Sequence, residues 1–177
     1  MLGITILMYG CNTIKAPFVG LAPDLSTLPV DEMRSLAAEV EATVKSGNRD
    51  AVLEDRGGLV VSSEEVRHAI RTRCARSELI REMLDAGFIF EEDNGLVAII
   101  RNGEYKARTT SKERDRHAMI VMGENGNRWT LYEGIMKDSN LETRSLSAIQ
   151  SIFHEERVKM MASGQQYVDA EGNRIAR

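Results

Sequence analysis

A short run around residue 124 carries the polar side chains whose spacing could do chemistry. It reads ENGNRWTLY and places Glu124, Arg128 and Tyr132 at intervals of four, with Asn125 and Asn127 between them. Glu four residues before Arg is the favourable order for an ion pair on a helix face. The cluster predicts either a contact with a partner or ligand, or a hydrogen-bonded network that fixes the packing of two helices. We favour the network.

Other candidate groups do not form a catalytic arrangement in the sequence. Glu91 and Glu92 are adjacent in an expected strand, so their side chains should point to opposite faces. His68, His117 and His154 lack the spacing of metal ligands. There is also no nucleophile elbow, phosphate-binding loop or dinucleotide fingerprint. We therefore expect no metal site and no cofactor.

Four segments have the apolar periodicity of amphipathic helices. They are residues 31–45, a long helix that follows Ser62 and stops at Gly87, residues 110–137, and residues 143–162. Ser62 with Glu65, and Thr110 with Glu113, have the spacing of capping boxes that begin the second and third helices.

Charged residues are unusually dense on the second expected helix. We expect its arginines to form a solvated face paired with Glu78 and Glu82, rather than a phosphate site; they are Arg67, Arg71, Arg73, Arg76 and Arg81. Cys74 lies on the inward stripe and is predicted to be a core residue.

The third expected helix mixes apolar and polar residues on one side. Its predicted apolar side contains Ala118, Val121, Met122, Trp129, Tyr132, Ile135 and Met136. Asn125 and Arg128 lie on or beside this stripe, and buried polar groups must find partners.

Two β-hairpins are predicted from alternating apolar residues and turn signals. The first pairs residues 88–90 with 96–100, and the second lies within 165–177 and turns at Glu171-Gly172. Because an isolated hairpin is marginal in water, we expect both to meet in one small antiparallel sheet. The polar, net basic segment 101–117 predicts a mobile solvated loop rather than an anion contact. The expected fold is α+β, mainly α, in one unit over residues 31–177.

The first residues, MLGITILMYGCNTIK, place Cys11 after a short apolar run. This layout resembles a bacterial lipoprotein signal, with residues 1–10 as the signal, Cys11 as the lipidated residue and 11–30 as a flexible tether. No Lys or Arg precedes Lys15, so the alternative is a buried first strand with Cys11 as a small apolar residue. By analogy, Asn12 favours sorting to the outer membrane.

Bulk composition narrows the classes of protein. The net charge of −4 argues against a dedicated nucleic-acid binder. No run reaches the ~18 apolar residues of a membrane-spanning helix. Two cysteines cannot make a disulfide framework.

The second half of the chain carries a set of short motifs in a fixed order. They are GFIFEEDNGL with Glu91 as its acid, then Glu124-Asn125-Gly126-Asn127-Arg128 followed by Tyr132, then GQQY, and last GNRI. With these motifs, residues 73–177 resemble the YdbL-like family, a bacterial envelope domain of unknown function. Ile175 stands where the family usually has Trp, which makes the last hairpin less typical.

The resemblance implies an accessory factor of the cell envelope that associates with large AsmA-like proteins, which are proposed to carry lipids between membranes. Some members are lipoproteins, and no enzymatic activity is established for the family. We therefore expect a lipid-anchored, non-catalytic, periplasm-facing protein at the outer membrane. The alternative is an envelope hydrolase that uses Glu91 and the Glu124/Arg128/Tyr132 cluster. A cleft that gathers these groups around a strongly shifted carboxylate would favour the enzyme. A convex surface on which they satisfy one another would favour the accessory protein.

Overall fold

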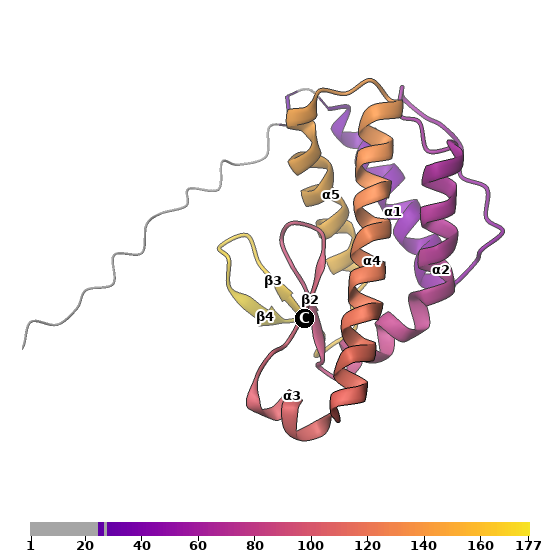
Figure 1. The fold of residues 1–177 in the computed structure, drawn as a ribbon. Coiled ribbons are helices and arrows are strands. Elements are labelled where there is room, and N and C mark those ends of the chain that lie inside the picture. Colours follow the sequence, from indigo (N-terminus) through magenta and orange to yellow (C-terminus); the bar gives the residue numbers. More distant parts are fainter. Residues whose placement is uncertain (1–24, 27) are drawn as a thin grey trace, which may run out of the picture.

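A computed structural model describes residues 25, 26 and 28–177 of the chain (Figure 1). The helices are α1 (Val30–Ser46), α2 (Glu64–Asp85), α3 (Gly103–Arg108), α4 (Ser111–Asp138), the short 3-10 helix η1 (Thr143–Ser145) and α5 (Leu146–Lys159). The strands are β1 (Ile89–Glu91), β2 (Val97–Ile99), β3 (Gln166–Val168) and β4 (Arg174–Ala176). The predicted class, α+β and mainly α, is confirmed.

A side-chain cap begins α4 as predicted, but not α2. At the start of α4, the Thr110 hydroxyl accepts from the Glu113 N–H at 3.2 Å, and the Glu113 carboxylate accepts from the Thr110 N–H at 2.7 Å, which confirms the predicted capping box. The box predicted for α2 is wrong. Ser63 is the N-cap there, and Ser62 instead donates its hydroxyl to the Asp55 carboxylate at 2.8 Å.

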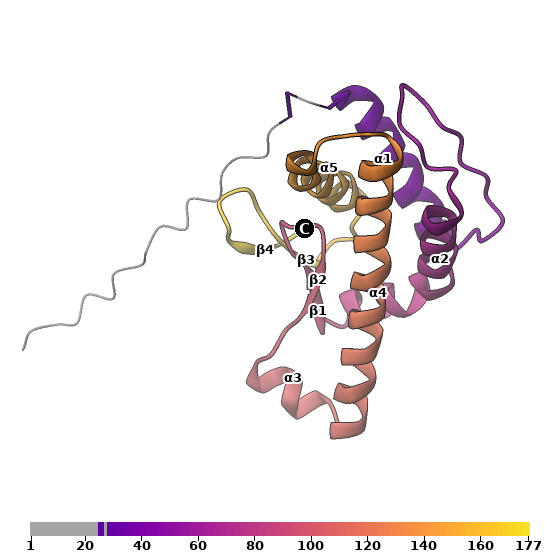
Figure 2. The same ribbon diagram turned by 45° about the horizontal axis from the view of Figure 1, so that its top comes forward.

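The four long helices pack together (Figures 1 and 2) and bury the larger of two apolar clusters. Helix α2 lies against both α1 and α4, and α5 lies against both α1 and α4. At the crossing of α2 and α4 the helices approach so closely that a Cβ on Gly134 would collide with Cγ2 of Val66. Cys74 is buried in this core, as predicted. None of the helices in the described part has the length and apolarity to cross a membrane.

The two hairpins form one four-stranded sheet in the order β2-β1-β3-β4. That they share a sheet confirms the prediction, but the expectation of an entirely antiparallel sheet is wrong. Glu91 of β1 lies opposite Tyr167 of β3 in a parallel pair, because the hairpins join through their first strands, which run in the same direction. Asn125 of α4 closes the outer edge of β2. Its amide accepts from the Val97 N–H and donates to the Val97 carbonyl, both at 2.9 Å.

The segment 101–117 was predicted as a mobile solvated loop, but its first part contains α3. From Ser111 on it forms the first turns of α4, as the capping box predicted. The Asn102 side chain accepts from the Tyr105 N–H at 2.8 Å and caps α3. Tyr105 is buried, and its ring packs against those of Phe88 and His117. A local cap and one buried aromatic side chain are therefore what order this polar segment.

Helix α4 reverses part of its predicted orientation. Met122 is 70% exposed and Trp129 is 42% exposed, although both were expected to face inward. Ala118 is exposed as well. The inward positions on this stretch are taken by the charged residues Glu124 and Arg128.

The predicted signal segment 1–10 and the predicted lipidation site Cys11 lie outside the described residues. Within the last part of the predicted tether, Leu28 is buried in the core and Val30 begins α1.

Candidate functional site

The helices and the sheet meet around a closed ring of six buried, oppositely charged side chains. We call it the ionic ring, and its members are Glu41, Arg73, Glu91, Glu124, Arg128 and Arg157. None of the six is more than 8% exposed. Glutamates and arginines alternate, so each arginine joins two glutamates and each glutamate joins two arginines.

Two arginines form one half of the ring. Arg73 of α2 contacts Glu41 of α1 and Glu124 of α4, each at 2.9 Å. Arg128 contacts Glu124 at 2.8 Å, one helical turn away, and Glu91 of β1 at 2.6 Å. The favourable Glu124–Arg128 order expected from the sequence is therefore present as an ion pair. This half of the ring connects three helices to the sheet.

Arg157 of α5 closes the ring, with Glu91 at 3.0 Å and Glu41 at 2.9 Å. It also donates to the Tyr132 hydroxyl at 2.9 Å, which in turn donates to the Gly95 carbonyl at 2.8 Å. That same carbonyl accepts from both Arg128 and Arg157 at 3.2 Å. The turn between β1 and β2 is thus fixed on the ring.

The carbonyl of Gly95 can approach the ring because this residue has no side chain. Its φ of +78° is a conformation that favours glycine, and a Cβ there would lie 3.0 Å from both the Tyr132 hydroxyl and the Gln150 carbonyl. The glycine in the predicted hairpin turn therefore serves the ring as well as the turn.

The ring keeps its carboxylates ionised. Burial is the largest influence on each and alone would raise its pKa. For Glu41, the guanidiniums of Arg157 and Arg73 outweigh burial and hold the pKa well below the ordinary 4.5. For Glu124, Arg73 and Arg128 lower the pKa to about 2. The pKa of Glu91 is likewise lowered, because Arg128 and Arg157 outweigh its burial.

The lowered pKa values of the three carboxyls limit the chemistry that the ring can perform. A general acid must hold a proton near neutral pH, which requires a raised carboxyl pKa, and a strong general base also needs a pKa well above that of Glu124. A carboxylate held at low pKa by two arginines meets neither need. In the part of the chain that the structure describes, no group of three or more His, Cys, Asp or Glu side chains is arranged to hold a metal ion.

Four of the six residues singled out in the sequence come together. Glu91, Glu124 and Arg128 are ring members, and Tyr132 hydrogen-bonds to the ring. Asn125 instead closes the edge of β2. The Asn127 amide donates to the Gly123 carbonyl at 3.0 Å within its own helix and does not reach the ring.

Three ring residues were missed by sequence reasoning, namely Glu41, Arg73 and Arg157. For Arg73, the expectation of a solvated face is wrong, because its side chain is 1% exposed. A usable signal was present. Arg73 directly precedes Cys74 on the inward stripe of α2, and Arg157 follows the inward Phe153 by one turn of α5. A long charged side chain at an inward position calls for a buried partner of opposite sign.

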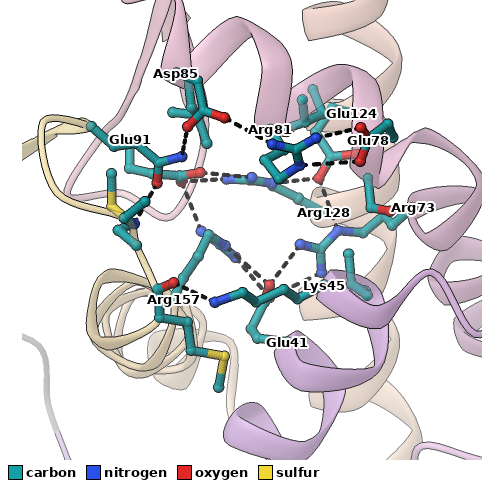
Figure 3. A pocket seen from close by; sticks show the side chains of 18 residues that line it. Glu41, Lys45, Arg73, Glu78, Arg81, Asp85, Glu91, Glu124, Arg128 and Arg157 are labelled. Carbon is teal, nitrogen blue, oxygen red and sulfur yellow. Dashed lines mark hydrogen bonds and ion pairs between the residues drawn. The ribbon is translucent and has the colours of Figure 1, made fainter.

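A pocket of about 200 Å³ opens beside the ring, between the ends of α1, α2 and α5 (Figure 3). Ring residues form its charged base, and apolar side chains from the three helix ends line its walls.

In comparisons with known proteins, no protein-family model, no curated protein and no solved structure matches this chain. The resemblance to the YdbL-like family therefore stays a prediction.

Proposed function

We propose that this chain is a lipid-anchored, non-catalytic protein of the bacterial cell envelope that faces the periplasm from the outer membrane and acts by binding another protein. One observation carries the binding role. The outer face of α4 exposes Met119, Met122 and Trp129, with 70%, 70% and 42% of each residue accessible. Methionine and tryptophan are enriched at protein interfaces, and tryptophan is frequent among the residues that dominate binding energy.

The spacing of these residues supports one continuous contact surface. Positions 119, 122, 126 and 129 share one face of a helix, because they recur at intervals of three and four. Gly126 lies between Met122 and Trp129, and a Cβ there would meet nothing within 4 Å. The face therefore has a shallow gap flanked by two large side chains, which suits an apolar side chain of a partner.

The resemblance noted above supplies a candidate partner, a large AsmA-like envelope protein. A photo-crosslinking amino acid placed at Met122 in the native host should yield an adduct with the AsmA-like protein of that host. The matched control is Val52, which is also apolar and is 76% exposed but lies between α1 and α2. Equal crosslinking from both positions, or none from Met122, would contradict the proposed contact surface.

The anchor is tested separately. Cys11 is the proposed lipidation site, whereas Cys74 is buried in the core. In cells fed labelled palmitate, we expect the chain to be labelled and Cys11→Ala to abolish the label, while Cys74→Ala retains it. Mass spectrometry of the mature N-terminus should find acyl chains on Cys11. An intact Met1 in the native host would contradict the anchor and leave the α4 surface to be judged on its own.

A further inference from the structure

Another pocket lies where α3, β2 and the first turns of α4 meet. Figures 1 and 2 show α3 beside the start of α4 and below the sheet. The volume of the pocket is about 320 Å³, which lies within the roughly 300–1,000 Å³ of small-molecule sites. Its apolar lining comes from Ile99, Tyr105 and Ala118. It shares no lining residue with the pocket beside the ionic ring.

The charged side chains that line this pocket do not balance. Arg101, Lys106 and Arg114 contribute three positive charges and Asp115 contributes one negative charge, which leaves two positive charges. This surplus is local, because the whole chain has a net charge of −4. It belongs to the net basic segment 101–117, for which an anion contact was the alternative interpretation of the sequence.

Two of the three cations have no partner in the described part of the chain. Neither the Arg101 guanidinium nor the Lys106 ammonium makes a hydrogen bond or an ion pair with a described residue. By contrast, Arg108 of the same helix as Lys106 pairs with Glu104 at 3.2 Å. The N–H groups of Arg101 and Lys106 can therefore bind an acceptor in the pocket without breaking a contact of the fold.

The third cation, Arg114, is held in place at the pocket. Its Nη1 donates to the carbonyl oxygen of Thr109 and, at 3.4 Å, to the Thr109 hydroxyl. These contacts leave the N–H groups of Nε and Nη2 for other acceptors. Burial raises the pKa of the Tyr105 hydroxyl, and the positive charges of Arg114 and Arg101 oppose this rise. Both guanidiniums therefore lie close enough to act on the same part of the lining.

We propose that this pocket binds the phosphate group of a phosphomonoester. At pH 7 such a group carries a charge of about −1.5 to −2 and three strong acceptor oxygens. The charge matches the surplus of two positive charges, and the oxygens match the three cationic side chains. The planar fork of an arginine suits phosphate oxygens, and a lysine binds phosphate as a point charge. This site is independent of the proposed partner surface on α4 and of the anchor.

The first test titrates the purified full chain with inorganic phosphate and follows the backbone amides by NMR. The ionic strength is kept constant with sodium chloride, because salt screens contacts between exposed charges. We expect saturable shifts that are largest in residues 101–107 and 114–118. Acetate, which carries a single negative charge, should bind at least about threefold more weakly. The absence of saturable shifts with phosphate, or equal binding of acetate and phosphate, would overturn the proposal.

A matched pair of charge variants separates a site from diffuse attraction. Arg101→Gln combined with Lys106→Gln should weaken phosphate binding by about tenfold, the scale of two exposed charge contacts. The control combines Lys112→Gln with Arg116→Gln. It removes the same two charges from the same segment, at exposed positions that do not line the pocket, and should weaken binding less than about twofold. An equal loss in both double variants would show that only the general charge of the segment attracts phosphate, and would overturn the site.

A second pair of variants tests the pocket by shape and leaves every charge in place. Ala118 is exposed and lines the pocket, so Ala118→Trp should fill it and abolish phosphate binding. Ala107 is exposed on α3 and is not among the lining residues, so Ala107→Trp should retain binding. Circular dichroism checks that each variant is folded. Phosphate binding that survives Ala118→Trp would place the ion elsewhere and overturn the assignment.

Two further probes distinguish the source of the phosphate group. Glycerol 3-phosphate presents it in solution, and phosphatidylcholine vesicles that contain phosphatidic acid present it as a lipid head group, with phosphatidylcholine alone as the control. Binding of glycerol 3-phosphate would support the site with a soluble ligand. Sedimentation of the chain with the phosphatidic acid vesicles, lost when Arg101 and Lys106 are both replaced by Gln, would support it with a lipid. Failure of both probes would overturn the assignment to a phosphomonoester.

Discussion

In the middle of α4, the two faces contrast in the opposite sense to those of an ordinary amphipathic helix. The inner face buries Glu124 and Arg128, whereas the outer face exposes Met119, Met122 and Trp129. Charged side chains are almost never fully buried unless they are paired. Here every buried charge of the ionic ring has at least two partners of opposite sign, which offset the cost of its burial. The comparison teaches that Glu124 and Arg128 hold the fold together, whereas the apolar side chains of Met119, Met122 and Trp129 are left free to contact other molecules.

The largest expected effect is from breaking the ring on the inner face. Arg128→Met leaves Glu91 without one of its two arginine partners and Glu124 without one of its three, in a buried site. Removing one member of a buried ion pair typically costs about 3–5 kcal/mol, so we expect a loss of this size in the free energy of unfolding measured with urea.

A double-mutant cycle sharpens this prediction. Glu91→Gln combined with Arg128→Met removes a neutral pair of charges rather than a single one. The double variant should therefore lose less stability than the sum of the single variants, by about 0.5–3 kcal/mol. Strict additivity would mean that the two side chains do not stabilise each other.

Low pH should reduce the stability that the ionic ring gives to the fold. The pKa of Glu124 is about 2 in the folded chain, against an ordinary 4.5. A carboxyl whose pKa is lowered by folding stabilises the fold fully above pH 4.5, and this contribution is lost as the pH falls to about 2. Urea midpoints should fall steeply through this window, and Glu124→Gln should show a shallower fall. A midpoint independent of pH over this window would contradict the ionised ring.

Alanine substitutions at two glycines of α4 test the packing on its two faces. Gly134 faces Val66, with which a Cβ would collide, whereas Gly126 on the outer face has open space. We expect Gly134→Ala to destabilise the chain by about 1–3 kcal/mol. Gly126→Ala should stabilise it by about 0.5–1 kcal/mol, because alanine loses less entropy in a helix. Thermal or urea unfolding of the pair checks both signs, and the same sign for both would contradict the assignment of faces.

The smallest effect on stability is expected from the outer face itself. Met122→Gln should change the free energy of unfolding by no more than about 0.5 kcal/mol, because Met122 is 70% exposed. The same change should weaken the proposed partner contact. A large loss of stability would indicate that this face packs within the chain.

Sequence patterns predicted the elements well and the orientation of α4 in part: Val121, Tyr132, Ile135 and Met136 are buried as predicted, whereas Ala118, Met122 and Trp129 are exposed. Periodicity located the four long helices and both hairpins, because local apolar spacing and turn residues determine these. Met122 and Trp129 were assigned inward because apolarity alone decides that pattern. The inward position of Glu124 and Arg128 depends on Arg73 of α2 and Glu91 of β1, which lie 51 and 37 residues away in the chain from their respective partners.

Only the local contacts of the ionic ring could be predicted from the sequence. The pair of Glu124 and Arg128 is local, at a spacing of four, so the sequence shows it. Glu41 and Arg157 are 116 residues apart, and only the tertiary fold brings them to 2.9 Å. The parallel pairing of β1 with β3 was missed because strand order between hairpins is likewise not encoded locally.

The central claim is that the ring carboxylates stay ionised at neutral and mildly acidic pH and serve the fold. Carbon-13 NMR of the glutamate side-chain carboxyls, followed as a function of pH and assigned with Glu124→Gln, tests it most directly. We predict that Glu41, Glu91 and Glu124 all remain ionised down to the acid limit of the fold, with no titration near neutrality. A ring carboxyl that takes up a proton between about pH 5 and pH 8 would contradict the account and revive the hydrolase hypothesis.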